Sequence, residues 1–222
     1  MSAAVRQGDL FGDEAPALPP GVALLRGRIG IAESRALLDE ALPVFAAAPP
    51  YRPRLKSGAA MINTLTSCGA LGWHSDETGY RYVDRHPQLG APWPPIPPRL
   101  AHAAVAAAEA CGVAGFDPDS CLINLYAADG RMNLHQDHDE ADFAWPIVSF
   151  SFGGNGVFAI GGLRRRDPVQ TVTLHHGDVL VLHGAGRMLF HGVRRIVPGT
   201  APFAHPAIPP GGRLNLTFRR AA

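Results

Sequence analysis

Three residues in the second half of the chain have the types and spacing of metal ligands. His135 and Asp137 stand two positions apart, and His191 follows an apolar run and precedes a glycine, as expected at a strand end. On a β-strand, residues i and i+2 point to the same face, roughly 6.6 Å apart, so the imidazole and the carboxylate could converge on one ion. Two histidines and one carboxylate leave coordination positions open, which suits iron(II) that must also bind a cosubstrate and O2.

The segment 213–219 alternates between polar and apolar residues with a period of two. Such alternation is typical of a strand with one face in the core and the other toward solvent or a cavity. If the polar face lines a cavity, Arg213 and Arg219 could bind both ends of a dicarboxylate, because a guanidinium matches carboxylate geometry bidentately. A surface strand with a solvated polar face would produce the same pattern.

A second predicted strand, 121–126, repeats this design. Asn124 and Tyr126 fall on one face, and Ile123 and Leu125 fall on the other. The amide and the phenol could complete the hydrogen bonds to the same dicarboxylate. As ordinary sheet residues they would need no ligand.

The elements that must position these residues are short strands and two helices. The 25 glycines and 21 prolines indicate many turns, as in a mainly β or α+β fold. Helices are expected over 33–47, where Pro43 should end or kink the helix, and over 99–111, which Gly112 should end. Closely spaced strands after residue 120 favour a sandwich or barrel. The expected strands are 59–66, 121–126, 147–152, 156–160, 169–174, 178–182, 188–192 and 213–219.

The order of the polar residues closely resembles the AlkB-type dioxygenases. Segment 63–73 is similar to that family's lid, 134–140 to its core motif and 215–219 to its closing motif. The resemblance extends from about residue 9 to the end of the sequence. It implies an α+β, mainly β fold: a jelly-roll (double-stranded β-helix) core with N-terminal helices packed outside and a nucleotide-recognition lid within about 50–95.

The resemblance also implies a division of the chain and a role for each site residue. Residues 1–20 would form a flexible tail, 21–114 the helical support and lid, and 115–222 the jelly-roll core. The implied iron ligands are His135, Asp137 and His191. The implied 2-oxoglutarate ligands are Asn124, Tyr126, Arg213, Asn215 and Arg219. The residues expected at the damaged nucleotide are Trp73, Tyr80, Tyr82, Asp139 and Arg165.

The activity that follows from the resemblance is oxidative demethylation of alkylated bases of the 1-methyladenine and 3-methylcytosine type. Iron(II) is the expected cofactor, 2-oxoglutarate and O2 are the cosubstrates, and formaldehyde, succinate and CO2 are the products. Such bases carry a positive charge, which an aromatic face such as Trp73 attracts and a carboxylate such as Asp139 offsets. The expected substrates are single-stranded or double-stranded DNA, with RNA as a further candidate.

Some positions differ from the family's best-known members. His138 stands where a lysine would help with a phosphate, His183 stands where an aromatic is expected, and the 192–212 loop is longer and rich in proline. These differences bear on substrate affinity and range.

Three alternatives remain open at this point. An iron and 2-oxoglutarate oxygenase could act on a protein or a small molecule, since the core motifs allow it. A zinc hydrolase using the same three ligands would leave Arg213 and Arg219 without a role. A non-catalytic jelly-roll binding protein would not need the whole ligand set.

Composition and charge limit the possible partners and location of the protein less sharply than the motifs limit its chemistry. The net charge is +1, so the chain lacks the strongly basic character of many nucleic-acid-binding domains. The three cysteines form no zinc pattern. No signal peptide and no membrane span are apparent. We therefore expect a monomeric cytoplasmic protein with no membrane partner.

Overall fold

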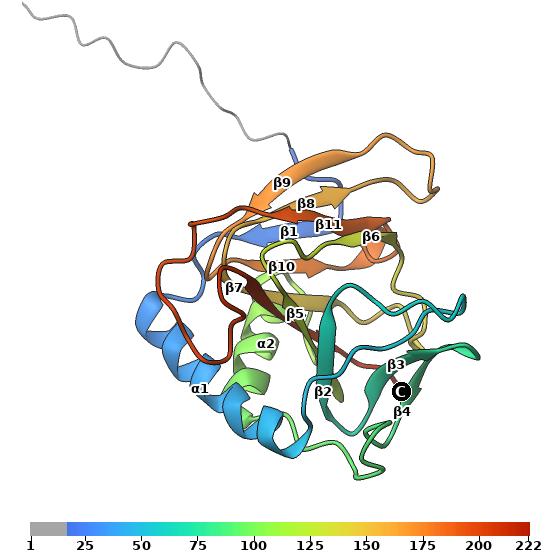
Figure 1. The fold of residues 1–222 in the computed structure, drawn as a ribbon. Helices are drawn as coiled ribbons and strands as arrows, with labels where there is room; N and C mark the ends of the chain where they lie inside the picture. The colour runs from blue at the N-terminus through green and yellow to red at the C-terminus, as the bar shows by residue number, and fades with distance from the viewer. Residues whose placement is uncertain (1–16) are drawn as a thin grey trace, which may run out of the picture.

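The structure is a computed structural model that describes residues 17–222, and Figure 1 shows two β-sheets packed face to face with two helices outside them. The predicted tail, residues 1–20, falls almost entirely outside the described residues. The mainly β fold with external helices is confirmed. No helix of the described chain is long and apolar enough to cross a membrane.

The larger sheet has six antiparallel strands, in the order β1-β10-β7-β12-β5-β2. Its strands come from distant parts of the sequence, and the central strand, β12, pairs with β7 on one side and with β5 on the other. Two strands of the segment 21–114, β1 and β2, form its edges. In that spatial order the strands are Val22–Leu25, Val179–Leu182, Ile147–Gly153, Arg213–Arg219, Ser120–Tyr126 and Thr64–Gly69.

The smaller sheet has four antiparallel strands, in the order β6-β11-β8-β9. It faces the larger sheet, and the two enclose the cavity described below. Their bounds are Met132–His135, His191–Ile196, Gly156–Ile160 and Gln170–Leu174.

The helices cover the outer face of the larger sheet (Figure 1). α1 spans Ile31–Ala47 and α2 spans Pro98–Ala110, within two residues of the predicted bounds. Pro43 was expected to end or kink this helix, and the first of these outcomes is wrong, because α1 continues to Ala47. Pro43 lies on the exposed face one turn after Asp39, which is also exposed, so water can satisfy the carbonyl that loses its helical partner.

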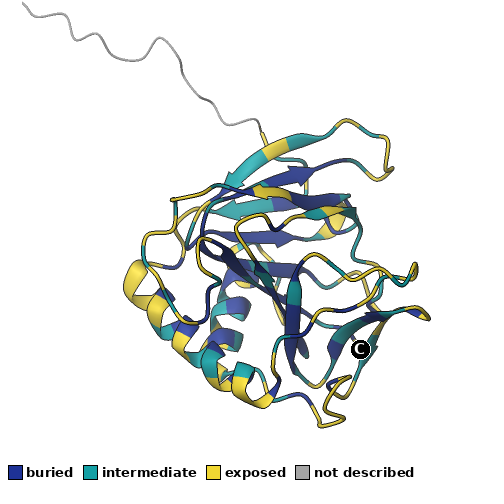
Figure 2. Cartoon of the chain, in the orientation of Figure 1, coloured by how far each residue is buried: buried dark blue, intermediate teal, exposed yellow. Residues whose placement is uncertain are grey.

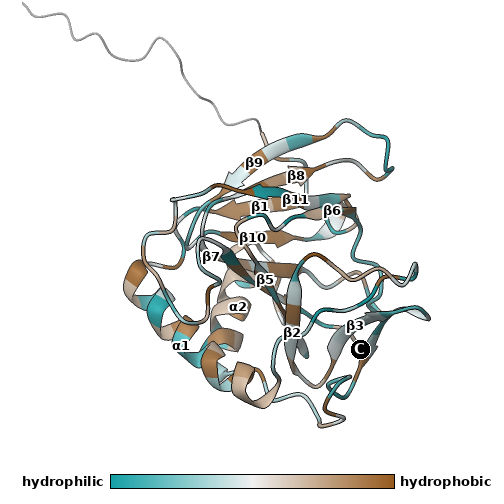
Figure 3. Ribbon diagram, viewed as in Figure 1, coloured by the Kyte–Doolittle hydropathy of each residue, from teal (hydrophilic) through white to brown (hydrophobic). Residues whose placement is uncertain are grey.

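The period-two pattern divides the sheet residues between two cores. Phe150, Leu216 and Phe218 pack against the helices in one cluster, whereas Ile147, Phe158 and others fill part of the space between the sheets. In Figure 2 the centre of the larger sheet and the inner faces of the helices are mostly dark blue, and in Figure 3 strands β1 and β10 are brown over most of their length. The predicted alternation of 213–219 is confirmed, with Leu216 buried and Arg213 and Asn215 turned toward the cavity.

Two predicted strands lie elsewhere along the chain. The strand expected at 59–66 begins only at Thr64, where pairing with Leu125 of β5 starts. The strand expected at 188–192 begins at His191, because the preceding residues follow the short 3-10 helix η1, Gly184–Gly186, and make loop hydrogen bonds. His191 therefore opens strand β11 rather than ending a strand.

A two-stranded hairpin lies beside the open end of the sandwich, within the predicted lid. It is formed by β3, Gly72–Asp76, and β4, Gly79–Val83. Its turn is held by Asp76, whose two carboxylate oxygens accept hydrogen bonds from Arg81 at 2.9 and 2.7 Å. A small apolar cluster that includes Tyr51, Leu65 and Trp93 joins the hairpin to the larger sheet.

Candidate active site

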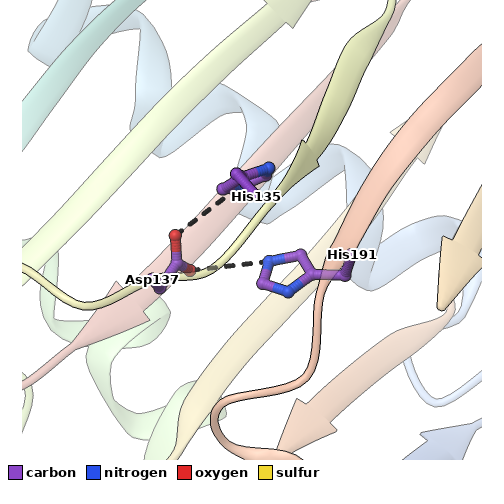
Figure 4. Close-up of side chains that lie close together, drawn as sticks. All are labelled: His135, Asp137 and His191. Atoms are coloured by element: carbon purple, nitrogen blue, oxygen red, sulfur yellow. Dashed lines mark ion pairs between the residues drawn. The ribbon is translucent and has the colours of Figure 1, made fainter. Parts of the chain in front are cut away.

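The three predicted metal ligands meet between the sheets. Their candidate ligand atoms all lie within 4.8 Å of one another. Asp137 Oδ1 is 3.5 Å from His135 Nε2, and Asp137 Oδ2 is 3.7 Å from His191 Nε2 (Figure 4). His135 and His191 are direct partners in the register of β6 and β11. The sequence placed His135 and Asp137 on one strand, but β6 ends at His135 and Asp137 lies just beyond it.

Backbone carbonyls orient both imidazole rings. His135 Nδ1 lies 2.9 Å from the carbonyl of Asn133, and His191 Nδ1 lies 2.9 Å from that of Leu189. A carbonyl can only accept, so each Nδ1 carries the proton and each Nε2 keeps its lone pair for a metal. Gly192 allows the close approach of β6 beside His191, since a side chain there would collide with the carbonyl of Met132.

The charge state of Asp137 also fits a metal site. Burial alone would raise the pKa of Asp137, but the positive charge of Arg219 and contacts with both histidines hold it well below its usual range. Asp137 is therefore a carboxylate at neutral pH, which is the form that ligates a metal. Burial would lower the pKa of His135, yet its hydrogen bond with Asp137 and the charge of that residue raise it.

A buried ionic network holds the metal-site carboxylate. Arg219 Nη2 lies 2.6 Å from Asp137 Oδ2, and Arg219 Nε lies 3.0 Å from Glu140 Oε1. Arg187 Nη2 lies 2.9 Å from Glu140 Oε2, and Arg187 Nη1 donates to the backbone carbonyl of Asp137 at 2.8 Å. Two carboxylates and two guanidiniums thus form a closed ring around the segment that follows β6.

Arg213 lies at the other end of the polar face of β12, and its side chain is 1 % exposed. It donates to the hydroxyl of Ser151 and to the carbonyls of Gly154 and Leu174. None of its polar contacts within residues 17–222 is to a carboxylate. Burial lowers the pKa of Arg213 to about 10, although Tyr126 and Asp178 partly oppose this effect. Gly156 makes room for the guanidinium, since a Cβ there would lie 3.2 Å from Arg213 Nε.

Several residues that line the cavity have a buried polar atom without a hydrogen-bond partner among the described residues. These atoms include Arg213 Nε, Arg219 Nη1 and the side-chain oxygen of Asn124. Leaving buried polar groups unpaired costs free energy, so these atoms fit a ligand with hydrogen-bonding groups. A guanidinium lines the cavity at each end of the β12 face, and the one without a carboxylate partner is suited to bind a carboxylate. The cavity therefore fits a dicarboxylate such as 2-oxoglutarate.

Asn215 and Tyr126, the other two residues assigned to the dicarboxylate, differ from Arg213, Arg219 and Asn124 because neither has an unpartnered buried polar atom within the described chain. The amide of Asn215 donates to Ser149 Oγ and to the carbonyl of Phe150, and it accepts from Thr217 Oγ1. It lines the cavity, but its polar atoms already have protein partners. Tyr126 is buried, which raises its pKa to about 12, so it faces the cavity as a neutral phenol.

The hairpin presents an aromatic face at the cavity mouth. The rings of Trp73 and Tyr80 stack at 5.6 Å between centroids, and Tyr80 is exposed. The indole of Trp73 donates to Asp139 Oδ2 at 2.8 Å, while Asp139 Oδ1 lies 2.9 Å from His138 Nδ1. Aromatic surface and a carboxylate therefore lie together at the mouth.

All thirteen predicted site residues line one cavity of about 540 Å³. Arg165 reaches it from the β8–β9 connection, where its guanidinium lies 5.1 Å from the ring centroid of Phe190. Tyr82 reaches it from β4 and donates to Glu140 Oε1 at 2.8 Å.

The sequence reasoning missed two of the buried charged residues. Glu140 lies in the segment 134–140 that resembles the core motif, but the resemblance assigned no role to it. Arg187 lies far from any motif in the sequence, and no local pattern marks it. Arg187 directly follows η1 and is buried in an ion pair with Glu140.

Comparisons with known proteins agree with this geometry. A model of the 2OG-Fe(II) oxygenase superfamily matches residues 21–219. The chain is 44% identical over 218 residues to the alpha-ketoglutarate-dependent dioxygenase AlkB of Salmonella typhimurium, covering 96% of this chain and 98% of that one. It is 30% identical over 179 residues to the mouse nucleic acid dioxygenase ALKBH1, covering 81% of this chain and 43% of that one.

A solved structure described as OsALKBH1 has the same fold. It superposes with a TM-score of 0.76 at 31% sequence identity, covering 91% of this chain and 99% of that chain. The predicted jelly-roll fold is thereby confirmed.

Proposed function

The chain belongs to the 2OG-Fe(II) oxygenase superfamily as an AlkB-type, Fe(II)- and 2-oxoglutarate-dependent dioxygenase, and from this premise we propose that it removes alkyl groups from nucleic-acid bases at the cavity between its sheets. The motif resemblance drawn from the sequence is confirmed. The proposal concerns the role of each residue and the identity of the substrate.

We assign the metal to the Nε2 atoms of His135 and His191 and to the carboxylate of Asp137. Arg213 and Asn124 would bind 2-oxoglutarate through their unpartnered atoms, and Arg219 through Nη1. Tyr126 would contribute a neutral hydroxyl. When bound, iron and 2-oxoglutarate supply the oxidising power that, with O2, hydroxylates the alkyl carbon next to a base nitrogen, with release of succinate, CO2 and, from a methyl group, formaldehyde.

The residues at the mouth would select the base. Trp73 and Tyr80 offer stacked aromatic surface, which attracts a cationic methylated base. Asp139 would accept a hydrogen bond from the exocyclic amine and offset the positive charge. Arg165 and His138 lie where a phosphate or sugar could approach. The apolar walls around Phe158 and Leu180 exclude water from the reacting carbon.

The observation that carries the proposal is the location of Trp73 and Asp139 at the mouth of the cavity that contains the triad. A direct test incubates the protein with single-stranded oligonucleotides carrying 1-methyladenine or 3-methylcytosine, with and without iron and 2-oxoglutarate. Mass spectrometry should detect loss of the methyl group only when both are present. If 2-oxoglutarate is consumed while every methylated oligonucleotide stays intact, the substrate is a protein or a small molecule instead.

Strand preference and assembly extend the proposal. A base must leave its stack to reach the cavity, and that cost is lower in a single strand. We therefore expect faster turnover of single-stranded than of duplex substrate, with DNA and RNA compared in the same assay. We further propose a cytoplasmic monomer. Light scattering of the purified protein and cell fractionation test these two points.

A further inference from the structure

The β3–β4 hairpin is fastened to the metal-site loop at two adjacent points. Trp73 and Tyr82 are direct cross-strand partners on the hairpin. The indole of Trp73 donates to Asp139, and the hydroxyl of Tyr82 donates to Glu140, each at 2.8 Å. These two carboxylates follow Asp137 closely in the sequence, so the hairpin contacts the same short loop that supplies a metal ligand.

The Tyr82 contact leads directly to the metal site. Glu140 Oε1 accepts from Tyr82 and also lies 3.0 Å from Arg219 Nε. The same guanidinium reaches Asp137 Oδ2 at 2.6 Å through Nη2. Arg219 lines the cavity, and its Nη1 is buried without a hydrogen-bond partner among the described residues. A continuous path of contacts therefore joins the hairpin, Glu140, Arg219 and Asp137.

The shared oxygen makes the two contacts interdependent. A hydroxyl that donates to Glu140 Oε1 withdraws part of the negative charge that the oxygen presents to Arg219, and it also fixes where the oxygen lies. Arg187 anchors the other oxygen, Oε2, at 2.9 Å, so Glu140 can adjust mainly on its Oε1 side. A change in the hairpin position is therefore transmitted to Arg219 rather than absorbed by rotation of Glu140.

We propose that Tyr82 and Glu140 are positioning residues that couple nucleotide docking on the hairpin to the hold of Arg219 on Asp137 and on 2-oxoglutarate. The inference rests on the proposed function, because the nucleotide stacks on Trp73 and Tyr80 of the same hairpin. The oligonucleotide and 2-oxoglutarate then bind with positive cooperativity. By linkage, each ligand raises the affinity of the other by the same factor.

The test measures that factor without turnover. Calorimetry gives the 2-oxoglutarate Kd of the Mn(II)-loaded protein, with and without a saturating single-stranded oligonucleotide carrying 1-methyladenine. We expect the oligonucleotide to lower the Kd of the wild type by about fivefold or more. In Tyr82→Phe, the ratio of the 2-oxoglutarate Kd without the oligonucleotide to the Kd with it should fall to within about twofold of one. Glu140→Gln, which keeps an acceptor for Tyr82 but removes the charge facing Arg219, should lose the cooperativity as well.

Tyr51→Phe is the matched control. Tyr51 is another tyrosine packed against the hairpin. Its hydroxyl contacts His74 Nδ1 at 3.1 Å, and His74 in turn contacts Asp76; neither His74 nor Asp76 lines the cavity. This variant should keep the wild-type ratio, so its loss there would overturn the proposal. A wild-type ratio near one, or an undiminished ratio in Tyr82→Phe, would also overturn it even if the oligonucleotide is demethylated. An oligonucleotide that neither binds nor reacts would overturn the proposed substrate, and the coupling with it.

Discussion

Arg219 and Asp137 form a buried ion pair, with 2.6 Å between Nη2 and Oδ2. The carboxylate in this pair is the one that faces both histidines. Arg219 therefore orients a metal ligand, and it also keeps Nη1 as a buried donor without a partner among the described residues, at the wall of the cavity. The sequence predicted a role for Arg219 toward the dicarboxylate and gave no indication of its contact with Asp137.

Arg219→Lys should therefore weaken metal binding as well as 2-oxoglutarate binding. An ammonium lacks the planar fork that reaches Asp137 and Glu140 together, and loss of such a supporting contact typically costs about 10–100-fold in metal affinity. Anaerobic titration with Fe(II) measures the metal affinity. Arg220→Lys is the control, because Arg220 packs over Trp145 outside the cavity. Unchanged Fe(II) affinity in Arg219→Lys would show that the pair does not orient Asp137.

Arg213→Met should affect the cosubstrate without affecting the metal. The buried guanidinium has no carboxylate partner within the described chain, and losing a desolvated charge contact typically costs about 2–5 kcal/mol. The 2-oxoglutarate KM should therefore rise at least tenfold. In thermal unfolding, 2-oxoglutarate should stabilise the wild type but not the variant. If it still stabilises the variant equally, Arg213 is not its binding partner.

Loss of any one metal ligand should abolish turnover. His135→Ala, Asp137→Ala and His191→Ala each remove one of three protein ligands, and two ligands do not sustain the open site. Succinate production measures turnover, and circular dichroism verifies folding. Near-normal succinate from a variant supplied with iron would contradict the assignment. Chelation of the wild-type metal should abolish activity, and Fe(II) should restore it.

Trp73→Ala should lower kcat/KM on a 1-methyladenine oligonucleotide by roughly one to two powers of ten, because stacking on an aromatic side chain is worth about 1–3 kcal/mol per base. Trp73→Phe keeps an aromatic face but lacks the indole donor to Asp139. It should therefore retain more activity than Trp73→Ala. Equal efficiency of all three proteins would show that the base does not stack there.

His176 should make the fold sensitive to acid. Its Nδ1 accepts from the backbone N–H of Gly153 at 3.0 Å. Burial, followed by the charge of Arg213, lowers its pKa in the folded state. The unfolded chain then binds the proton more readily, so the stability due to neutral His176 is present above the unfolded pKa of about 6.5 and is lost as pH falls.

The measurement is the urea-derived free energy of unfolding at pH 7 and pH 5. His176→Gln should lose less stability over this interval than the wild type. His102→Gln, on the exposed face of α2, serves as the control and should follow the wild type. A variant His176→Gln with the wild-type pH dependence would refute the assignment.

The sequence predicted the strands best where burial differs sharply between faces. Segment 213–219 lies in the centre of the larger sheet, with helices on one side and the cavity on the other, so its period of two survives intact. The β3–β4 hairpin was not predicted, because each of its strands has only five residues and the two strands pair only with each other. The strand ends near His135 and His191 were misplaced, since they depend on loop hydrogen bonds rather than periodicity.

The site residues, like the strands, could be predicted where a local sequence pattern marks them and not where only the tertiary fold brings them together. The triad was identified because its members lie in recognisable local patterns, and the structure brings them together. The roles assigned to the individual site residues, Asn215 and Arg165 among them, remain predictions. Glu140 and Arg187 form a contact that joins distant parts of the chain, and a local pattern cannot reveal a pairing that only the tertiary fold creates.

The strand order has a consequence for how the protein is made. β12 lies between β5 and β7, yet the ribosome synthesises it after both. Until residues 213–219 emerge, β5 and β7 each lack a neighbour on one side and present unpaired backbone groups to other chains. The larger sheet must therefore close late, through contacts between distant residues, and nascent chains stalled before Arg213 should be substrates for chaperones and proteases.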